Sequence, residues 1–285
     1  MERTEKIKVL SDSTCDLTPE EVEALGIELI PVEIILGTDV YLDGEGINAR
    51  RVLEYTKKTG QLPKTAATNT ERFKSYFKKY QDQGYKVIHF NISSKASGMH
   101  ANAVAAAKEL GGDIFVVDSM ALSSGQGLLI MKTCDYIREG KSYAEICEIL
   151  KTLPQKVQTS FVVDTLEFLH KGGRCSLAAM MGAKILKLHP YISMIDGQLK
   201  AKKKYAGTMQ KCLTSYVKDL AAEYAKYDDT RCFITHSPSD PALVEIVKSL
   251  AKELFNFKEV LESEAGSTVT SHCGENTVGL LFITE

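Results

Sequence analysis

Apolar and polar positions alternate along the first half of the chain in the order expected of an α/β fold. The short apolar runs KIKVLSD, IELIPVEIIL, YKVIHFNIS and DIFVVDS each predict a strand, and segments with helical spacing lie between them. In DLTPEEVEALG, Thr18 and Glu21 predict a capping box, Pro19 stands at the first helical position and Gly26 ends the helix. Strands alternating with helices favour a layered α/β fold with a mainly parallel sheet.

Four further helices are predicted before the chain midpoint, and one segment is interpreted as a linker. The helices are expected from Asn48 to Lys58, over TERFKSYFKKYQDQG, from about Gly98 onward, and over SSGQGLLIMKTCDYIREG. The linker is GQLPKTAATN. One more helix, SYAEICEILKTL, has Ser142 as its cap with Glu145 three positions on, and Pro154 ends it.

After Pro154 the pattern changes, and we place a domain boundary there. The stretch HPYISMIDGQLKAKKK has an Asp-Gly pair between two strand-like runs, which is typical of a β-hairpin. Helices are predicted over AGTMQKCLTSYVKDLAAEYAKY and DPALVEIVKSLAKEL. We therefore predict a three-layer α/β/α domain with a mainly parallel sheet at residues 1–156. Residues 157–285 are expected to form an α/β domain with a mixed, largely antiparallel sheet, and the ligand site should lie between the two domains.

The composition, net charge and cysteine spacing of the chain limit which classes of function are compatible with it. The chain has 285 residues, 44% of them apolar and 25% charged, with a net charge of -2, which fits a globular protein without bulk attraction for nucleic acid. No run resembles a signal peptide or a membrane span, so we expect a cytoplasmic protein without stable membrane insertion, although transient membrane contact is compatible with it. The seven cysteines are scattered and never spaced as CxxC, which indicates reduced thiols and no structural metal site.

The stretch NISSKASGMHANA carries the first candidate site. A strand, a loop of small residues and a helix in that order place the loop at the carboxyl edge of a sheet, where α/β folds bind ligands. The free N–H groups of a helix start favour an anion, Ser97 adds a hydroxyl, and Gly98 lets a ligand approach the backbone. The simpler interpretation is that Ser97 only caps the helix.

Three other segments carry polar residues of the same kind. KTAATNTERF has Thr65 and Thr68 in a polar loop, and VVDSMALSSGQGLL has Asp118 and Ser119 after a strand. STVTSHCGENTVGLLFITE places His272 in a predicted loop between two apolar runs. A neutral or protonated imidazole could donate a hydrogen bond to a carboxylate, although a loop histidine bonded to backbone is the plainer alternative.

In their order and spacing, these segments resemble the DegV family, whose members include the fatty-acid-binding subunit of bacterial fatty acid kinase. The matching stretches are SDSTCDLTPE, ISSKASGMHANA, VVDSMALSSGQGLL, FVVDTLEFLHKGGRCS, HPYISMIDGQL and SHCGENTVGLLF. The resemblance implies a long-chain fatty acid as ligand between two domains, with no other cofactor. It implies that Thr65, Ser97, Gly98 and His272 hold the carboxylate.

The resemblance also implies a partner, the ATP-binding subunit of a fatty acid kinase. Arg174 in GGRCS matches a family arginine linked to that kinase, and Lys202 belongs to a basic strand with Lys200, Lys203 and Lys204 where the family also carries cations. The plainer alternatives are an arginine on an exposed turn and a solvated strand edge. The chain lacks GxxxxGK[ST] and GxGxxG, so ATP is expected on the partner.

Two stretches depart from the family pattern. Ala66, Ala67, Thr68 and Asn69 follow Thr65 where the family usually has Ser-x-Pro-Ser, which removes a hydroxyl and a proline constraint. Gly274-Glu275-Asn276 stands where the family usually has Gly-Pro-Gly. If Glu275 faced the head group, it would repel a carboxylate.

The acyl chain would provide most of the affinity. Burial contributes about 0.8 kcal/mol per methylene, or on the order of 11 kcal/mol for about fourteen methylenes, against roughly 1.5 to 3 kcal/mol for each hydrogen bond to a charged carboxylate. The stretch SLAAMMGAKILKLHPYISMI contains apolar candidates for a channel, with plain core as the alternative: Leu177, Met180, Met181, Ile185, Leu186 and Met194.

Two other functions stay open on the sequence. A serine acyl-ester hydrolase would use Ser97 as nucleophile, His272 as base and Asp118 as orienting carboxylate, although KASGM is not the GxSxG elbow. A binding module for another small carboxylate is the third hypothesis.

Overall fold

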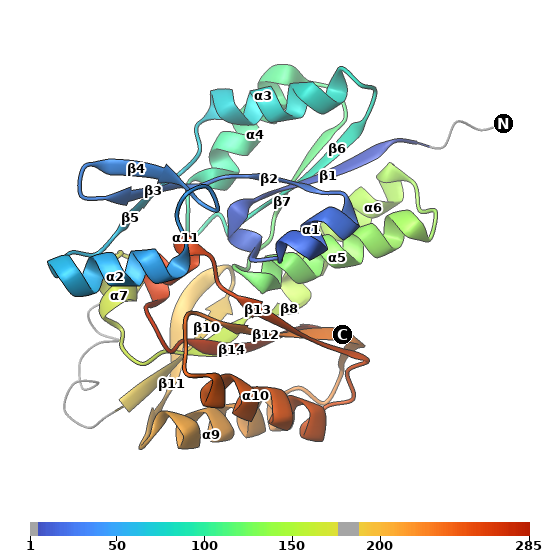
Figure 1. Ribbon diagram of the computed structural model, residues 1–285. Coiled ribbons are helices and arrows are strands. Elements are labelled where there is room, and N and C mark those ends of the chain that lie inside the picture. Colours follow the sequence, from blue (N-terminus) through green and yellow to red (C-terminus); the bar gives the residue numbers. More distant parts are fainter. Residues whose placement is uncertain (1–4, 176–187) are drawn as a thin grey trace.

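The computed structural model describes residues 5–175 and 188–285, and the strands of these ranges form three sheets (Figure 1). A four-stranded sheet has the order β2-β1-β6-β7, and a three-stranded sheet has the order β4-β3-β5. A seven-stranded sheet has the order β11-β10-β9-β14-β12-β13, with β8 beside β14.

The four-stranded sheet is parallel throughout and has helices on both faces, as predicted. Its strands are β1 (Ile7–Asp12), β2 (Glu28–Ile30), β6 (Lys86–Asn91) and β7 (Ile114–Asp118). Phe73 and Phe77 anchor one helical layer, and Leu128, Leu129 and Ile146 belong to the other. The first layer is α3 (Thr70–Gln81) with α4 (Met99–Leu110), and the second is α1 (Pro19–Leu25), α5 (Ser124–Arg138) and α6 (Tyr143–Leu150). Thr18 caps α1 as predicted.

The predicted single strand IELIPVEIIL was wrong, because the chain changes sheets at Pro31. β2 ends before Pro31, and β3 (Glu33–Leu36) pairs antiparallel with β4 (Asp39–Leu42) in the three-stranded sheet. Proline has no N–H for a strand ladder, which favours a break there. The predicted linker GQLPKTAATN also contains a strand, β5 (Lys64–Ala66), which pairs antiparallel with β3. Helix α2 (Ala49–Thr59) starts from Asn48, as predicted.

The seven-stranded sheet is mixed and largely antiparallel, also as predicted. Only the β12–β13 pair is parallel among the described strand pairs of this sheet. Its strands are β8 (Val157–Gln158), β9 (Ser160–Val162), β10 (Leu188–Ile195), β11 (Gln198–Ala206), β12 (Tyr227–His236), β13 (Glu259–Glu264) and β14 (Val278–Thr284). The Asp-Gly pair forms the predicted hairpin turn, with φ 52° at Asp196 and 73° at Gly197.

Helix α5 lies between the parallel sheet and the seven-stranded sheet. Its buried side chains belong to one cluster with Phe90 of β6, Phe233 of β12 and Leu281 of β14. The opposite face of the seven-stranded sheet is covered by α9 (Met209–Glu223) and α10 (Pro241–Leu254) (Figure 1). An alanine Cβ at Gly125 would lie 2.2 Å from Thr159 Oγ1, so close approach of α5 to this sheet requires glycine there.

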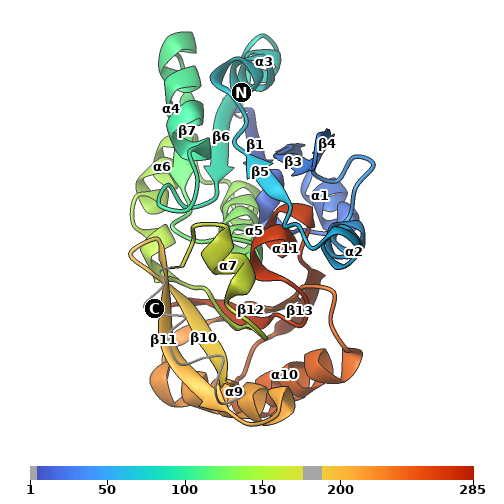
Figure 2. The ribbon, with the colours of Figure 1, turned by 90° about the vertical axis from the view of Figure 1, so that its left-hand side faces the viewer.

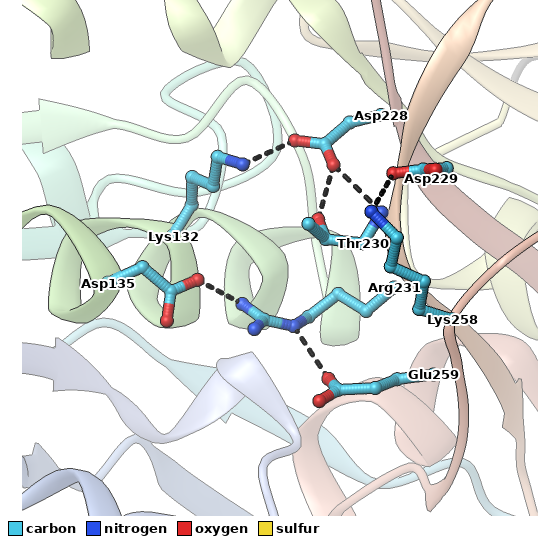
Figure 3. Close-up of polar contacts among 8 residues, drawn as sticks. All are labelled: Lys132, Asp135, Asp228, Asp229, Thr230, Arg231, Lys258 and Glu259. Carbon is cyan, nitrogen blue, oxygen red and sulfur yellow. Dashed lines mark hydrogen bonds and ion pairs between the residues drawn. The ribbon is translucent and has the colours of Figure 1, made fainter.

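An ion-pair network ties α5 to β12 and to the start of β13 (Figure 3). The Arg231 guanidinium lies 2.6 Å from Asp135 on α5 and 3.0 Å from Glu259, and Lys132 Nζ lies 2.5 Å from Asp228. The Arg231 side chain is only 12% exposed, so these contacts are better shielded from solvent than most ion pairs on the surface. These ion pairs join α5, which packs on the parallel sheet, to the seven-stranded sheet, in addition to the apolar packing between them.

The seven-stranded sheet begins at Val157, and the other two sheets use earlier residues. The division into domains at residues 156 and 157 falls between these sheets and stays a prediction.

Candidate functional site

His272 lies on a short helix, α11 (Ser267–Cys273), and the predicted loop at this place was wrong. The helix starts where carboxylates far away in the sequence accept its first N–H groups. Asp16 accepts from Gly266 N at 2.9 Å, and Asp43 accepts from Ser267 N at 3.1 Å. These caps come from distant segments, so the local sequence, rich in serine, threonine and valine, does not reveal the helix.

The imidazole of His272 is hydrogen-bonded to Thr65 of strand β5. The distance from Nε2 to Thr65 Oγ1 is 2.9 Å, and the buried Nδ1 has no hydrogen-bond partner. Burial and, to a smaller extent, the positive charge of Arg174 lower the pKa of His272 to about 4. The ring is therefore neutral at pH 7 and acts as a hydrogen-bonding group without charge.

Ser97 and Gly98 stand at the start of α4, in the loop that follows β6. The Ser97 hydroxyl accepts a hydrogen bond from Met99 N at 3.3 Å, which agrees with the simpler capping interpretation. The same hydroxyl lines the pocket described below and still has its hydrogen to donate. A Cβ at Gly98 would meet no atom within 4 Å, so a ligand has room beside this backbone.

One pocket brings these residues together. Thr65, Ser97, Gly98 and His272 all line a cavity of about 140 Å³ that is partly open to solvent. In Figure 2, α11 lies against α7 (Glu167–Lys171) and near β5, and these three elements form one side of the cavity. Most of the other lining side chains are apolar: Val32, Ala66, Ala67, Ile92, Ala96, Met99, Leu122, Leu169, Leu199, Val269 and Cys273.

Arg174 lines this pocket and is half-buried, so the predicted exposed turn was wrong. Its Nε donates to Ala96 O at 3.3 Å, and its guanidinium also bonds the carbonyl of Gly172. Burial lowers the pKa of Arg174 below its ordinary high value. The side chain bridges the loop before α4 and the end of α7, with its positive charge at the pocket.

Lys202 lies on β11, outside the residues that line the pocket. It forms an ion pair with Glu223 at the end of α9, and its ammonium lies 5.6 Å from the centre of the Tyr191 ring. The neighbouring Lys203 pairs with Asp219 at 2.5 Å. The basic strand is thus held against α9 by these contacts.

The two departures from the family pattern have different consequences. Glu275 does not line the pocket, and its carboxylate pairs with Lys57 of α2 at 2.6 Å, so it does not face the head-group residues. Thr68 is buried and donates to Pro31 O at 2.8 Å. Ala66 lines the pocket where the family usually has a serine, and Ala67 lines it at the variable position of the pattern.

A second, inner cavity of about 20 Å³ has wall residues in common with the first. The two cavities share Leu122, Val269 and Cys273 as lining residues. The polar side chains of the inner cavity all have hydrogen-bond partners in the protein: Ser123, Thr235, His236, Ser237 and Thr277. The remaining walls include Phe161, Ala265 and Leu281, so the inner cavity is largely apolar, and it must widen to admit an acyl chain because its volume is about that of one water molecule.

The sequence-based channel candidates do not account for this inner cavity. Leu177, Met180, Met181, Ile185 and Leu186 lie outside the described residues. Met194 packs against an apolar cluster that includes Leu122 and Ile192, but it does not line either cavity. Leu122, which directly follows DSMA, was not predicted as a cavity residue, because an isolated leucine in a loop carries no periodic signal.

The N-terminal motif SDSTCDL contributes to the pocket wall and anchors the loop that carries Ser97. Thr14 lines the pocket, and its hydroxyl is hydrogen-bonded to the buried Asp12 at 2.5 Å. Asp12 also accepts from Ile92 N at 2.9 Å, which ties the end of β1 to the loop that carries Ser97. Burial raises the pKa of Asp12, and it raises that of Asp16 to about 8 against the opposing effect of hydrogen bonds. No role for these carboxylates was predicted from the sequence.

The arrangement required of a serine hydrolase is not assembled. His272 Nε2 is bonded to Thr65, and the Ser97 hydroxyl is bonded to Met99 N. Asp118 accepts from the backbone of Ser94 and Met120 at 3.1 and 2.9 Å. The predicted Ser97–His272–Asp118 triad is therefore contradicted.

Within residues 5–175 and 188–285, no helix is both long and apolar enough to cross a membrane. No group of three or more potential metal-binding side chains is found in those ranges.

An α/β fold with a partly open pocket that combines hydrogen-bonding groups with apolar walls is typical of a small-ligand-binding protein. The family described as "Uncharacterised protein, DegV family" matches residues 6–285. A DegV domain-containing protein of Clostridium acetobutylicum is 31% identical over 281 residues, covering 98% of this chain and 99% of that protein. The chain belongs to the DegV family.

Solved structures agree in fold. A fatty-acid-binding DegV family protein from Thermus thermophilus superimposes with a TM-score of 0.90 at 27% identity, covering 98% of this chain and 100% of the other. The Streptococcus pneumoniae fatty acid kinase B3 protein, loaded with linoleic acid, has a TM-score of 0.84 at 18% identity over 98% of this chain and 100% of its own. The likeness at 18% identity shows the fold alone.

Proposed function

We propose that this protein binds a long-chain fatty acid and presents its carboxylate for phosphorylation by a separate kinase subunit. The carboxylate is held by the Thr65 and Ser97 hydroxyls, the backbone at Gly98 and the His272 imidazole. The acyl chain extends past Leu122, Val269 and Cys273 into the inner cavity. The relative from Thermus thermophilus, described as binding fatty acid, supports the ligand class.

The observation that supports this function best is a polar pocket that shares part of its wall with a largely apolar cavity. Four hydrogen-bonding positions converge at the outer cavity, and three residues line both cavities. A small carboxylate would use the outer cavity only. A long acyl chain uses both, and burial of its methylenes provides most of the free energy of binding.

The head-group residues also suit transfer of a phosphoryl group to the carboxylate. Hydroxyls and a neutral imidazole hold an oxygen by single hydrogen bonds, whereas a bidentate arginine would occupy both oxygens. Arg174 lines the pocket with its guanidinium already bonded to two backbone carbonyls. One carboxylate oxygen is therefore left for reaction with ATP bound on the partner.

Mass spectrometry of the organic extract of purified, denatured protein tests the ligand class. We expect a long-chain fatty acid in the extract and, after delipidation, a rise in Tm on adding palmitate but not acetate. An empty extract with no thermal shift from palmitate would refute the lipid proposal. A shift with acetate as large as with palmitate would favour a module for small carboxylates.

Docking of the kinase subunit is tested by charge reversal. Lys202→Glu lies away from the pocket, so we expect weaker acyl-phosphate formation with unchanged palmitate binding. Arg174→Gln is expected to reduce acyl-phosphate formation as well, and because Arg174 lines the pocket its palmitate affinity is measured in parallel. Normal phosphorylation in both variants would exclude these two residues from docking.

A further inference from the structure

The end of α7 closes against the imidazole of His272, and a glycine makes this contact. An alanine Cβ built at Gly172 would lie 2.5 Å from His272 Nδ1 and 3.3 Å from its Cε1. The φ of Gly172 is -74°, so its backbone conformation does not itself require glycine. The requirement for glycine therefore comes first from the histidine ring that fills the space of a side chain, and second from the Phe168 carbonyl oxygen, which would lie 2.9 Å from the same Cβ.

The contact determines which ring nitrogen is available to the pocket. Nδ1 faces the chain at Gly172, is buried and has no hydrogen-bond partner, whereas Nε2 lies 2.9 Å from Thr65 Oγ1. A hydrogen on Nδ1 would leave a buried N–H donor unpaired, which is rare in folded proteins. A hydrogen on Nε2 is donated to Thr65 and leaves only a lone pair at Nδ1. The second tautomer is favoured.

This tautomer fixes the direction of the Thr65 hydroxyl. When Thr65 Oγ1 accepts from His272 Nε2–H, its own hydrogen is free to point at a ligand oxygen. Arg174 is the charged side chain whose field acts on His272, and its positive charge opposes protonation of the ring. A neutral histidine thus supports a hydroxyl donor aimed at an anion.

We propose that Gly172 is a positioning residue for the head-group site. Its missing side chain lets α7 seal the Nδ1 edge of His272, which holds the ring as the Nε2–H tautomer and directs the Thr65 hydroxyl hydrogen into the pocket. The role in ligand binding rests on the proposed function, whereas the placement of the ring does not.

Nitrogen-15 NMR of histidine-labelled, delipidated protein tests the tautomer without any ligand. His272 is assigned by its absence from the spectrum of His272→Gln. We expect a neutral ring with hydrogen on Nε2 at pH 7. Hydrogen on Nδ1, or a rapidly exchanging mixture of both tautomers, would overturn the proposal.

Gly172→Ala tests the contact itself, with Gly173→Ala as the matched control. A methyl at Gly172 must displace the ring, so we expect the single tautomer to be lost and palmitate affinity to fall about 10-fold, as for loss of one hydrogen bond to a charged group. A Cβ at Gly173 meets no atom within 4 Å, although its φ of +75° strains any other residue. Gly173→Ala should therefore lower Tm and leave the His272 resonances unchanged.

A double-mutant cycle covers the case in which Gly172→Ala folds poorly. In a His272→Ala background the ring is gone, so the stability cost of Gly172→Ala should shrink, leaving only the contact of its methyl with Phe168 O at 2.9 Å. An equal cost in both backgrounds would show that the ring is not what Gly172 accommodates. If wild-type protein shows the expected tautomer but binds no palmitate, the proposed function fails while the placement of the ring stands.

Discussion

The outer and inner cavities share wall residues, but most of their polar groups are used differently. In the outer cavity, Ser97 Oγ accepts from Met99 N and keeps its hydrogen for a ligand, as Thr65 does in the tautomer proposed above. In the inner cavity, Ser123 and Thr277 donate their hydroxyl hydrogens to Asp16 and to the Cys273 carbonyl, and Ser237 accepts from Thr277 N. The presence of polar residues in a cavity wall therefore does not define a polar site; their unused hydrogen-bonding capacity does.

Filling the inner cavity should have the largest effect on ligand binding. Ala265 lines this cavity and not the outer one, so Ala265→Phe displaces the end of an acyl chain. Excluding four methylenes removes about 3 kcal/mol of burial and weakens palmitate binding about 100-fold. Calorimetry should show a much smaller loss for octanoate.

Ala251→Phe is the control for overpacking, because Ala251 lies on the buried face of α10 and lines neither cavity. It should lower Tm without a selective loss of palmitate. Equal palmitate affinity in Ala265→Phe and wild type would show that the chain does not enter the inner cavity.

The free energy of unfolding should fall in acid because the histidine of the outer cavity, His272, is buried. The pKa of His272 is about 4 in the folded protein against an ordinary 6.5, so the unfolded chain takes up a proton first as pH falls. The corresponding stability is fully present above pH 6.5 and is lost as pH falls toward 4, by about 3 kcal/mol. Urea unfolding at several pH values should give a flatter profile for His272→Gln.

His89 provides a comparison outside the site. It is packed between Phe73 and Phe77, neither ring nitrogen has a partner, and burial lowers its pKa to about 3, with a smaller contribution from His100. His89→Leu should also flatten the acid profile but leave palmitate affinity unchanged. If the free energy of unfolding of His272→Gln fell with pH as steeply as that of wild type, the low pKa of His272 would be contradicted.

Removing one hydroxyl from the outer cavity should cost less than filling the inner one. Thr65→Val keeps the shape of the side chain and removes the hydrogen bond to the carboxylate, so palmitate affinity should fall about 10-fold. Octanoate should lose a similar factor, since both acids have the same head group. Thr56→Val removes a hydroxyl bonded to Val52 O on α2 and should leave binding intact. If Thr65→Val weakened palmitate binding much more than octanoate binding, the outer cavity would not act on the head group alone.

Glu275→Gln should have the smallest effect. The carboxylate is paired with Lys57 at the surface and does not line the outer cavity. Exposed ion pairs contribute about 0 to 1 kcal/mol, so palmitate affinity should change by a few-fold at most. A large gain in affinity, measured by the same titration, would show that Glu275 repels the bound carboxylate.

Local signals in the sequence determined most helices and the parallel core strands. The capping boxes at Thr18 and Ser142, the strands that precede Ser97 and Asp118, and the Asp196-Gly197 hairpin depend on residues within a few positions of one another. The resemblance to a family then indicated Thr65, Ser97, Gly98 and His272, which the fold brings to one cavity. Whether they bind a carboxylate is the question for the proposed experiments.

Tertiary structure alone decided the features that depend on distant partners. The caps of α11 are carboxylates from Asp16 and Asp43, more than 200 positions earlier, so no local pattern could place His272 on a helix. The burial of Arg174, the pairing of Glu275 with Lys57 and the inner cavity beside Leu122 arise where separate elements pack together. Hydrogen bonds and apolar contacts of this kind act across space, whereas capping and periodicity act along the chain.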